Sequence, residues 1–134
     1  MGWIWNPKVA AFLAAFLFGR VDIAPKLIKI CRRESRCNPM GVHARDAHLS
    51  RREWVGQVRL DHLDRTCQPY KPGWATRGPW GLSAASHWQY LPKCYKPEWM
   101  DYTMVSALVA ARKYLRRCDG KRRKDRVGWC KRIR

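Results

Sequence analysis

The sequence predicts a mainly α-helical domain that contains disulfides and begins with an apolar helix. Three observations lead to this prediction. The chain has 134 residues, enough for one domain with a buried core. Residues 102–118 repeat apolar side chains at helical spacing, and no segment alternates as a strand would. Six spread-out cysteines without a CxxC pair are typical of disulfides formed in an oxidising compartment. We expect at least two bridges and favour three, with Cys118 bonded to an upstream cysteine; buried free thiols in a cytosolic protein are the alternative.

The first predicted element is a helix over residues 9–18, VAAFLAAFLF, with Pro7 suited to its first turn. Ten apolar residues match the core of a signal peptide and half of a membrane span, but no A-x-A cleavage site follows. Two pairs of alanines four residues apart allow close helix packing. We therefore expect residues 1–20 to be an anchor whose helix, residues 9–18, docks on a partner protein. A membrane surface and the core of the same domain are the alternatives.

The second predicted helix is capped by Asp22, has Pro25 in its first turn and stops at Asn38-Pro39, because a residue before proline resists the helical conformation. Residues 40–79 are mostly polar, with a weaker helix expected near residues 50–63, and residues 78–92 are rich in turns and aromatic side chains. The clearest amphipathic helix, residues 102–118, ends at Asp119-Gly120. We assign residues 21–120 to the main domain.

The charge of the chain is strongly positive, with 28 Lys and Arg against 10 Asp and Glu. A net charge of +18 attracts polyanions, so nucleic acid, anionic lipid and anionic cell-wall polymer are the expected classes of partner. Residues 121–134 hold eight of the basic residues and one acidic residue. We interpret this segment as a basic C-terminal tail that can bind an anionic polymer, with a simple solvated tail as the alternative.

One carboxylate stands out, that of Glu34. On a helical projection it lies roughly 20° from Leu27 and 40° from Ile30, so it projects from the apolar stripe in the last turn of its helix. Desolvation and the helix dipole there raise the pKa of a carboxyl group, while the neighbouring arginines oppose the rise. A carboxyl group that keeps its proton near neutral pH is what a glycosidase needs as its general acid. The alternative is a solvated or arginine-paired glutamate.

Glu34 also belongs to the first of three short motifs that follow one another along the chain. Glu34-Ser35 ends a helix, Gly78-Pro79-Trp80-Gly81-Leu82 follows, and Ala110-Ala111-Arg112-Lys113-Tyr114-Leu115 comes last. This order resembles the goose-type lysozyme and lytic transglycosylase superfamily, and in particular phage-associated lysozyme-like proteins. The family's Met-Gln after Gly-Leu is replaced here by Ser83-Ala84, and the gap between Glu34 and Gly81 is longer than the family's.

The resemblance implies a role for each motif. Glu34 would be the catalytic acid and base, Ser35 a hydrogen-bonding support, and Tyr114 a phenol near the carboxyl group. The backbone of Gly78–Leu82 would line the glycan groove, with Trp80 as the best candidate for an aromatic sugar platform. Either His87 or Gln89 would stand in for the missing family glutamine. Further aromatic residues near the expected groove are Trp74, Trp88, Tyr90 and Tyr95.

The expected activity is cleavage of the β-1,4 bond between N-acetylmuramic acid and N-acetylglucosamine in peptidoglycan, without a cofactor. Hydrolysis with inversion needs a second carboxylate as base, and direct retention needs one as nucleophile; spacing does not choose among Asp46, Glu53, Asp61, Asp64 and Asp101. Without one, Glu34 alone would act as acid and then base with help from the acetamido group of the substrate, a route to an anhydro product that the resemblance to lytic transglycosylases implies. The resemblance implies a phage virion protein acting in the bacterial wall or periplasm, with an exported bacterial protein as the alternative.

Three other functions remain as alternatives. A zinc-dependent wall peptidase would use His43, Asp46, His48, His62 and Cys67 as ligands. A basic nucleic-acid-binding protein fits the charge and the aromatic content, although no known nucleic-acid motif is present. A structural virion protein without catalysis is the third.

Overall fold

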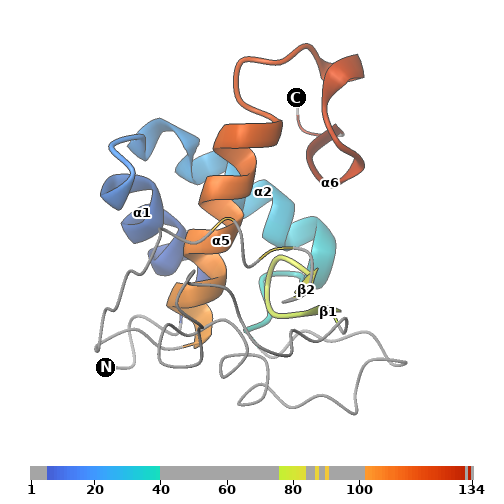
Figure 1. Ribbon diagram of the computed structural model, residues 1–134. Coiled ribbons are helices and arrows are strands. Elements are labelled where there is room, and N and C mark those ends of the chain that lie inside the picture. The colour runs from blue at the N-terminus through green and yellow to red at the C-terminus, as the bar shows by residue number, and fades with distance from the viewer. Residues whose placement is uncertain are drawn as a thin grey trace, which may run out of the picture.

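A computed structural model describes residues 6–39, 76–83, 87, 90, 102–131 and 133. These residues are mainly α-helical, which confirms the predicted class, and Figure 1 shows the helices packed together with one small hairpin. In chain order the elements are α1 (Pro7–Leu17), η2 (Val21–Ile23), α2 (Ala24–Ser35), β1 (Thr76–Arg77), β2 (Leu82–Ser83), α5 (Tyr102–Arg117), η6 (Arg123–Asp125) and α6 (Gly128–Lys131). The helix expected near residues 50–63 lies outside the described residues.

Helix α1 begins where the sequence predicts it. The side chain of Asn6 caps the helix by accepting a hydrogen bond of 2.9 Å from the backbone N–H of Lys8, and Pro7 occupies the first turn. Four fully buried alanines form its inner face, Ala10, Ala11, Ala14 and Ala15. This face packs on α5 and α2, because small side chains let helix backbones approach closely. The inner face of α1 therefore belongs to the core of the domain, the alternative that the sequence left open for this helix.

The outer face of α1 is apolar and exposed. Phe12, Phe16 and Leu17 expose 46%, 70% and 47% of their surface, whereas Leu13 packs against the core. Docking of this face on a partner stays a prediction. Among the described helices, none has the length and the apolar character that a membrane crossing requires.

Helix α2 differs from its predicted limits at both ends. Asp22 does not cap it; the side chain forms an ion pair with Arg20 instead, and Ile23 precedes the first helical turn. The helix stops at Ser35, before Asn38-Pro39, because Arg36 and Cys37 adopt left-handed backbone conformations with φ of 55°. A disulfide between Cys31 and Cys37 closes this turn.

The C-terminal segment is folded rather than a tail. Gly120, with φ of 71°, lies in the turn after α5, and η6 and α6 follow it. Cys130 forms a disulfide with Cys118, and both Cys130 and Ile133 are buried. Two disulfides are thus present, as predicted, but the expected upstream partner of Cys118 is wrong. Cys67 and Cys94 lie outside the described residues.

One ion-paired cluster joins the beginning of the fold to its end. The guanidinium of Arg20 lies 2.8 Å from one carboxylate oxygen of Asp119 and 3.1 Å from the other, and it also pairs with Asp22. The two carboxylates raise the pKa of Arg20 further above its usual range, and the hydrogen bond from Arg20 lowers the pKa of Asp22. The cluster fixes the end of α5 beside the segment that connects α1 to α2.

Candidate active site

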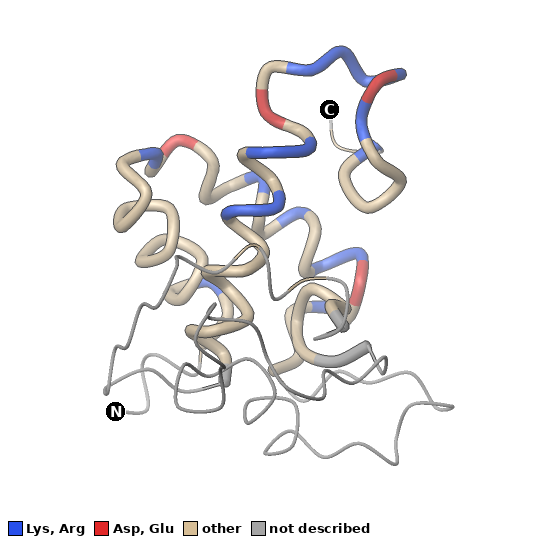
Figure 2. Tube along the Cα trace, viewed as in Figure 1, with Lys and Arg blue, Asp and Glu red and all other residues tan. Residues whose placement is uncertain are grey.

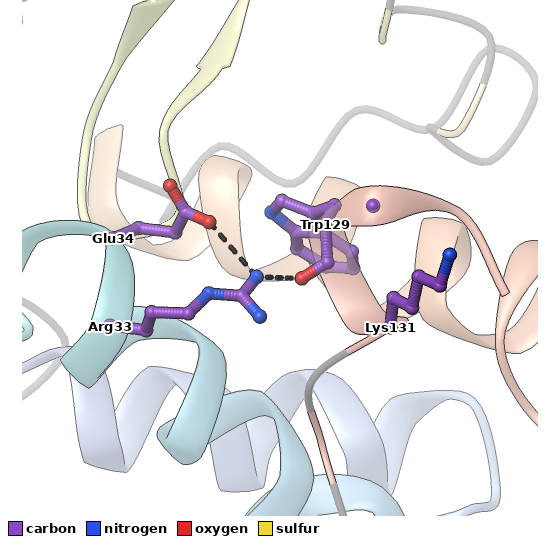
Figure 3. A pocket seen from close by; sticks show the side chains of 5 residues that line it. Arg33, Glu34, Trp129 and Lys131 are labelled. Carbon is purple, nitrogen blue, oxygen red and sulfur yellow. Dashed lines mark hydrogen bonds and ion pairs between the residues drawn. The ribbon is translucent and has the colours of Figure 1, made fainter. Parts of the chain in front are cut away.

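Glu34 lies in the last turn of α2, and its side chain is 29% exposed. Its Oε1 accepts a hydrogen bond of 3.0 Å from Nη2 of Arg33, which also donates to the backbone carbonyl of Trp129 (Figure 3). The arginine-paired glutamate, one of the alternatives that the sequence left open, is therefore the state present. Arg33 links the carboxylate to α6, a connection that the sequence does not predict.

The second oxygen of Glu34 faces the turn between β1 and β2. These short strands pair antiparallel, Arg77 with Leu82, and Gly81 closes the turn with φ of 61°. A Cβ atom built on Gly81 would lie 3.4 Å from Oε2 of Glu34. Glycine therefore serves two needs here: it adopts the left-handed conformation without strain, and it leaves the space beside the carboxylate open.

Ser35 attaches this turn to the end of α2. Its hydroxyl donates a hydrogen bond of 2.8 Å to the backbone carbonyl of Pro79 and accepts one of 3.1 Å from the N–H of Asn38. The first two motifs, 44 residues apart, thus meet through a hydrogen bond as well as through the approach of Gly81 to Glu34.

The prediction that Trp80 is a sugar platform is wrong. Its side chain is fully buried, and the indole N–H donates a hydrogen bond of 2.9 Å to the backbone carbonyl of Leu27. The side chain of Leu82 is also fully buried. Both residues fix the turn on the helical core, and neither side chain is available to a substrate.

A different tryptophan lies at the site. A cavity of about 520 Å³ is lined by Arg33, Glu34, Gly128, Trp129 and Lys131. Figure 3 shows the two α2 side chains opposite Trp129 and Lys131, which come from α6. The indole N–H of Trp129 donates a hydrogen bond of 3.0 Å to the backbone carbonyl of Trp80, and this bond holds α6 against the turn.

Helix α5 contributes a lysine to the surroundings of this cavity. The amine of Lys113 lies 4.7 Å from the centre of the Trp129 ring and 2.8 Å from Nε2 of His87. Burial lowers the pKa of Lys113 to about 8, although the charge of Glu34 acts in the opposite direction. Because the charge of Glu34 acts on the pKa of Lys113, the amine of this residue lies near the carboxylate. Lys113 belongs to the third of the three sequence motifs.

Tyr114 is buried on another side of α5. Burial raises the pKa of its phenol, and the charges that act on it are those of Arg126, Asp119, Arg20 and Asp22. The charges that act on the phenol are therefore those of Arg126 and of the ion-paired cluster that joins the two ends of the fold. Its expected position beside the Glu34 carboxyl group has no support from these interactions.

Several predicted site residues lie outside the described residues. They are Gln89, the aromatic residues Trp74, Trp88 and Tyr95, the candidate second carboxylates Asp46, Glu53, Asp61, Asp64 and Asp101, and the alternative zinc ligands His43, Asp46, His48, His62 and Cys67. Within the described part of the chain, no group of three or more His, Cys, Asp or Glu residues is arranged to hold a metal ion. Tyr90 is buried, with its ring centre 6.0 Å from that of His87.

The fold and the site define a disulfide-containing, mainly α-helical domain with one carboxylate in a cationic, tryptophan-lined cavity. No protein family, no curated protein and no solved structure matches the chain.

Proposed function

We propose that the protein cleaves the β-1,4 bond between N-acetylmuramic acid and N-acetylglucosamine in peptidoglycan, with Glu34 as the general acid. The observation that supports this most directly is the position of Oε2 of Glu34. This oxygen faces Gly81, a residue without a side chain, while Oε1 is hydrogen-bonded to Arg33. A partly exposed carboxyl group in a cavity that an indole also lines is suited to a sugar ring and its leaving oxygen.

In the proposed reaction, Glu34 donates its proton from Oε2 to the oxygen between the two sugars as that bond breaks. The carboxylate that results then accepts a proton from water or from a hydroxyl group of the cleaved sugar, and the oxygen that loses this proton bonds to the anomeric carbon from which the leaving oxygen departed. Water as the second reactant gives hydrolysis, and an internal hydroxyl gives an anhydro product. Arg33 pairs with the charged form of Glu34, so it stabilises the carboxylate that remains after the first proton transfer.

The test is to replace the carboxyl group and analyse the glycan fragments. Glu34→Gln keeps the shape of the side chain and removes the proton, so cleavage of purified walls should fall by at least about 100-fold, the usual contribution of a general acid. Asp125→Asn is the matched control, because Asp125 is an exposed carboxylate in η6 that does not line the cavity. Normal cleavage by Glu34→Gln, or an equal loss in both variants, would exclude Glu34 as the acid. The mass of the fragments from the wild-type protein distinguishes hydrolysis from anhydro-sugar formation.

Charge favours an anionic wall as the target. Lys and Arg positions are concentrated at the end of α5 and in the segment that follows it (Figure 2). They include Arg116, Arg117, Lys121, Arg122, Arg123 and Lys124. Such a surface draws a polyanion toward the cavity that α6 borders. The same surface is what favours the second candidate, nucleic-acid binding without catalysis, and the Glu34→Gln experiment decides between them.

We also propose a setting for the activity. The disulfides favour a protein that works outside the cytoplasm. The resemblance of the motifs to phage-associated lysozyme-like proteins favours a phage particle as the carrier that brings the protein to the wall. The outer face of α1 would then dock on another virion protein, because Phe12, Phe16 and Leu17 form an exposed apolar surface on a rigid helix.

The docking proposal is tested on purified particles. Phe16→Asp places a charge on the outer face without touching the buried alanines of α1. We expect this variant to cleave walls normally and to be missing from the particles. Incorporation at the wild-type level would show that this face does not dock.

A further inference from the structure

The C-terminal segment forms one wall of the Glu34 cavity, and this wall carries charge. Helix α6 places Trp129 and Lys131 opposite Arg33 and Glu34 (Figure 3). The position of α6 is fixed by three links: the disulfide between Cys118 and the buried Cys130, the hydrogen bond from Trp129 to the turn, and the contact with Arg33. These links fix the backbone of Lys131 at the cavity that Glu34 also lines.

The charges around the cavity do not balance. Its lining contains two cations, Arg33 and Lys131, and one carboxylate, that of Glu34. Arg33 is engaged by Glu34, whereas no ion pair joins Lys131 to a carboxylate within the described ranges. When Glu34 carries a proton, both cations lack a counter-charge in the lining. The amine of Lys113 adds positive charge on the Trp129 ring nearby.

We propose that this cavity binds a carboxylate group of the substrate, and that Lys131 is the residue that recognises it. The inference rests on the proposed function and specifies which part of the glycan strand it selects. Trp129 offers an apolar surface to a sugar ring, while Lys131 contacts an acidic substituent of that ring. An anion held there supplies Lys131 with the counter-charge that the lining lacks.

Two carboxylates of peptidoglycan have the required chemistry. One is the acid group of the muramic acid sugar, which is free in strands without peptides, and the other belongs to the peptide attached to it. Both are small, planar anions that a lysine amine binds as a charge-assisted hydrogen bond. Comparing peptide-free with peptide-bearing oligosaccharides distinguishes these two sources.

The experiment measures binding and cleavage with matched substrates. The probes are peptide-free and peptide-bearing N-acetylmuramic acid–N-acetylglucosamine oligosaccharides, each with its carboxylates either free or converted to neutral amides. Binding is measured on the Glu34→Gln variant, which does not consume the probe, and cleavage on the chain with Glu34 intact. We expect one free acid to bind about tenfold more tightly than its amide, a difference of about 1.4 kcal/mol. Lys131→Gln should remove this preference.

The control for general attraction is Lys29→Gln. Lys29 is exposed in α2 and does not line the cavity, and its replacement removes the same charge. If the tighter binding of the free acid comes only from the net charge of the chain, both lysine variants reduce it equally, and added salt abolishes it to the same extent in both. That result, or equal binding of acid and amide by the Glu34→Gln chain, overturns the proposal. Cleavage without an acid preference refutes only the carboxylate site, whereas an acid preference without any cleavage refutes only the proposed function.

Discussion

Gly81→Ala tests the geometry of the candidate site directly. The methyl group would lie 3.4 Å from Oε2 of Glu34 and 3.8 Å from its Cβ. These distances are ordinary contacts, so the carboxylate need not move. The methyl group nevertheless fills the space in which a leaving oxygen would approach, since a hydrogen bond from a carboxyl O–H requires an oxygen at about 2.5–3.0 Å. We expect wall cleavage to fall between about 10- and 100-fold, as for other small misplacements at reacting centres.

Stability provides the matched control for this prediction. Gly81 has φ of 61°, and Gly120 has φ of 71° with nothing within 4 Å of its Cβ position. Alanine at either position costs about 1–2 kcal/mol because of the left-handed backbone. Urea unfolding should therefore show a similar loss in both variants, whereas only Gly81→Ala should lose activity.

Two outcomes of the glycine experiment contradict the reasoning. If Gly81→Ala cleaves walls at the wild-type rate, Oε2 of Glu34 does not face the reacting bond. If Gly120→Ala loses as much activity as Gly81→Ala at equal stability, backbone strain and not access to the carboxylate explains the loss. Both activities are measured by release of soluble fragments from purified walls, at a temperature where each variant is folded.

Two further predictions concern the residues around the cavity. The pKa of Lys113 is lowered to about 8 in the folded chain and is about 10.5 in the unfolded chain, so the unfolded chain binds more protons between these values. Relative to Lys113→Met, the free energy of unfolding should rise from pH 8 to 10.5 by about 1–2 kcal/mol after solvent screening, and a flat difference in urea titrations would contradict this. Removing the bridge with Cys118→Ser and Cys130→Ser opens a loop with a sequence separation of 12 and should cost about 3 kcal/mol of stability. Activity should also fall at temperatures where the variant stays folded, because Trp129 loses its anchor; unchanged cleavage would show that α6 is not part of the site.

The parts of the fold that sequence predicted well depend on local patterns. Helix α1, helix α5 and the place of Glu34 in the last turn of α2 follow from apolar spacing and from residues that begin or end helices. The end of α2 was missed because two non-glycine residues, Arg36 and Cys37, adopt left-handed conformations. A rule based on Pro39 has no means of anticipating that choice.

The parts of the site that sequence missed depend on contacts between distant segments. Trp80 and Trp129 are both tryptophans in turn-rich, polar surroundings, and nothing local shows which is buried. Contacts in the folded chain determine it. The indole N–H of Trp80 donates a hydrogen bond to a buried backbone carbonyl of α2, and the disulfide between Cys118 and Cys130 holds the neighbouring Trp129 at the cavity. The one indication in the sequence was Cys130, the residue after Trp129. It would have placed Trp129 at the cavity only if the pairing of Cys130 with Cys118 had been predicted.

The two oxygens of Glu34 have different surroundings, and this asymmetry bears on the chemistry. Oε1 accepts from Arg33, which is itself held by the carbonyl of Trp129, so this oxygen is fixed and faces a cation. A proton on Oε1 would point at the N–H group that Arg33 already donates to this oxygen. A proton on Oε2 would not, because this oxygen lies beside Gly81, which has no side chain. Under the proposed function, the proton that a glycosidic oxygen receives would therefore be carried by Oε2. In that reaction Arg33 would act in both steps, because it would orient the protonated carboxyl group and stabilise the carboxylate after the proton has left.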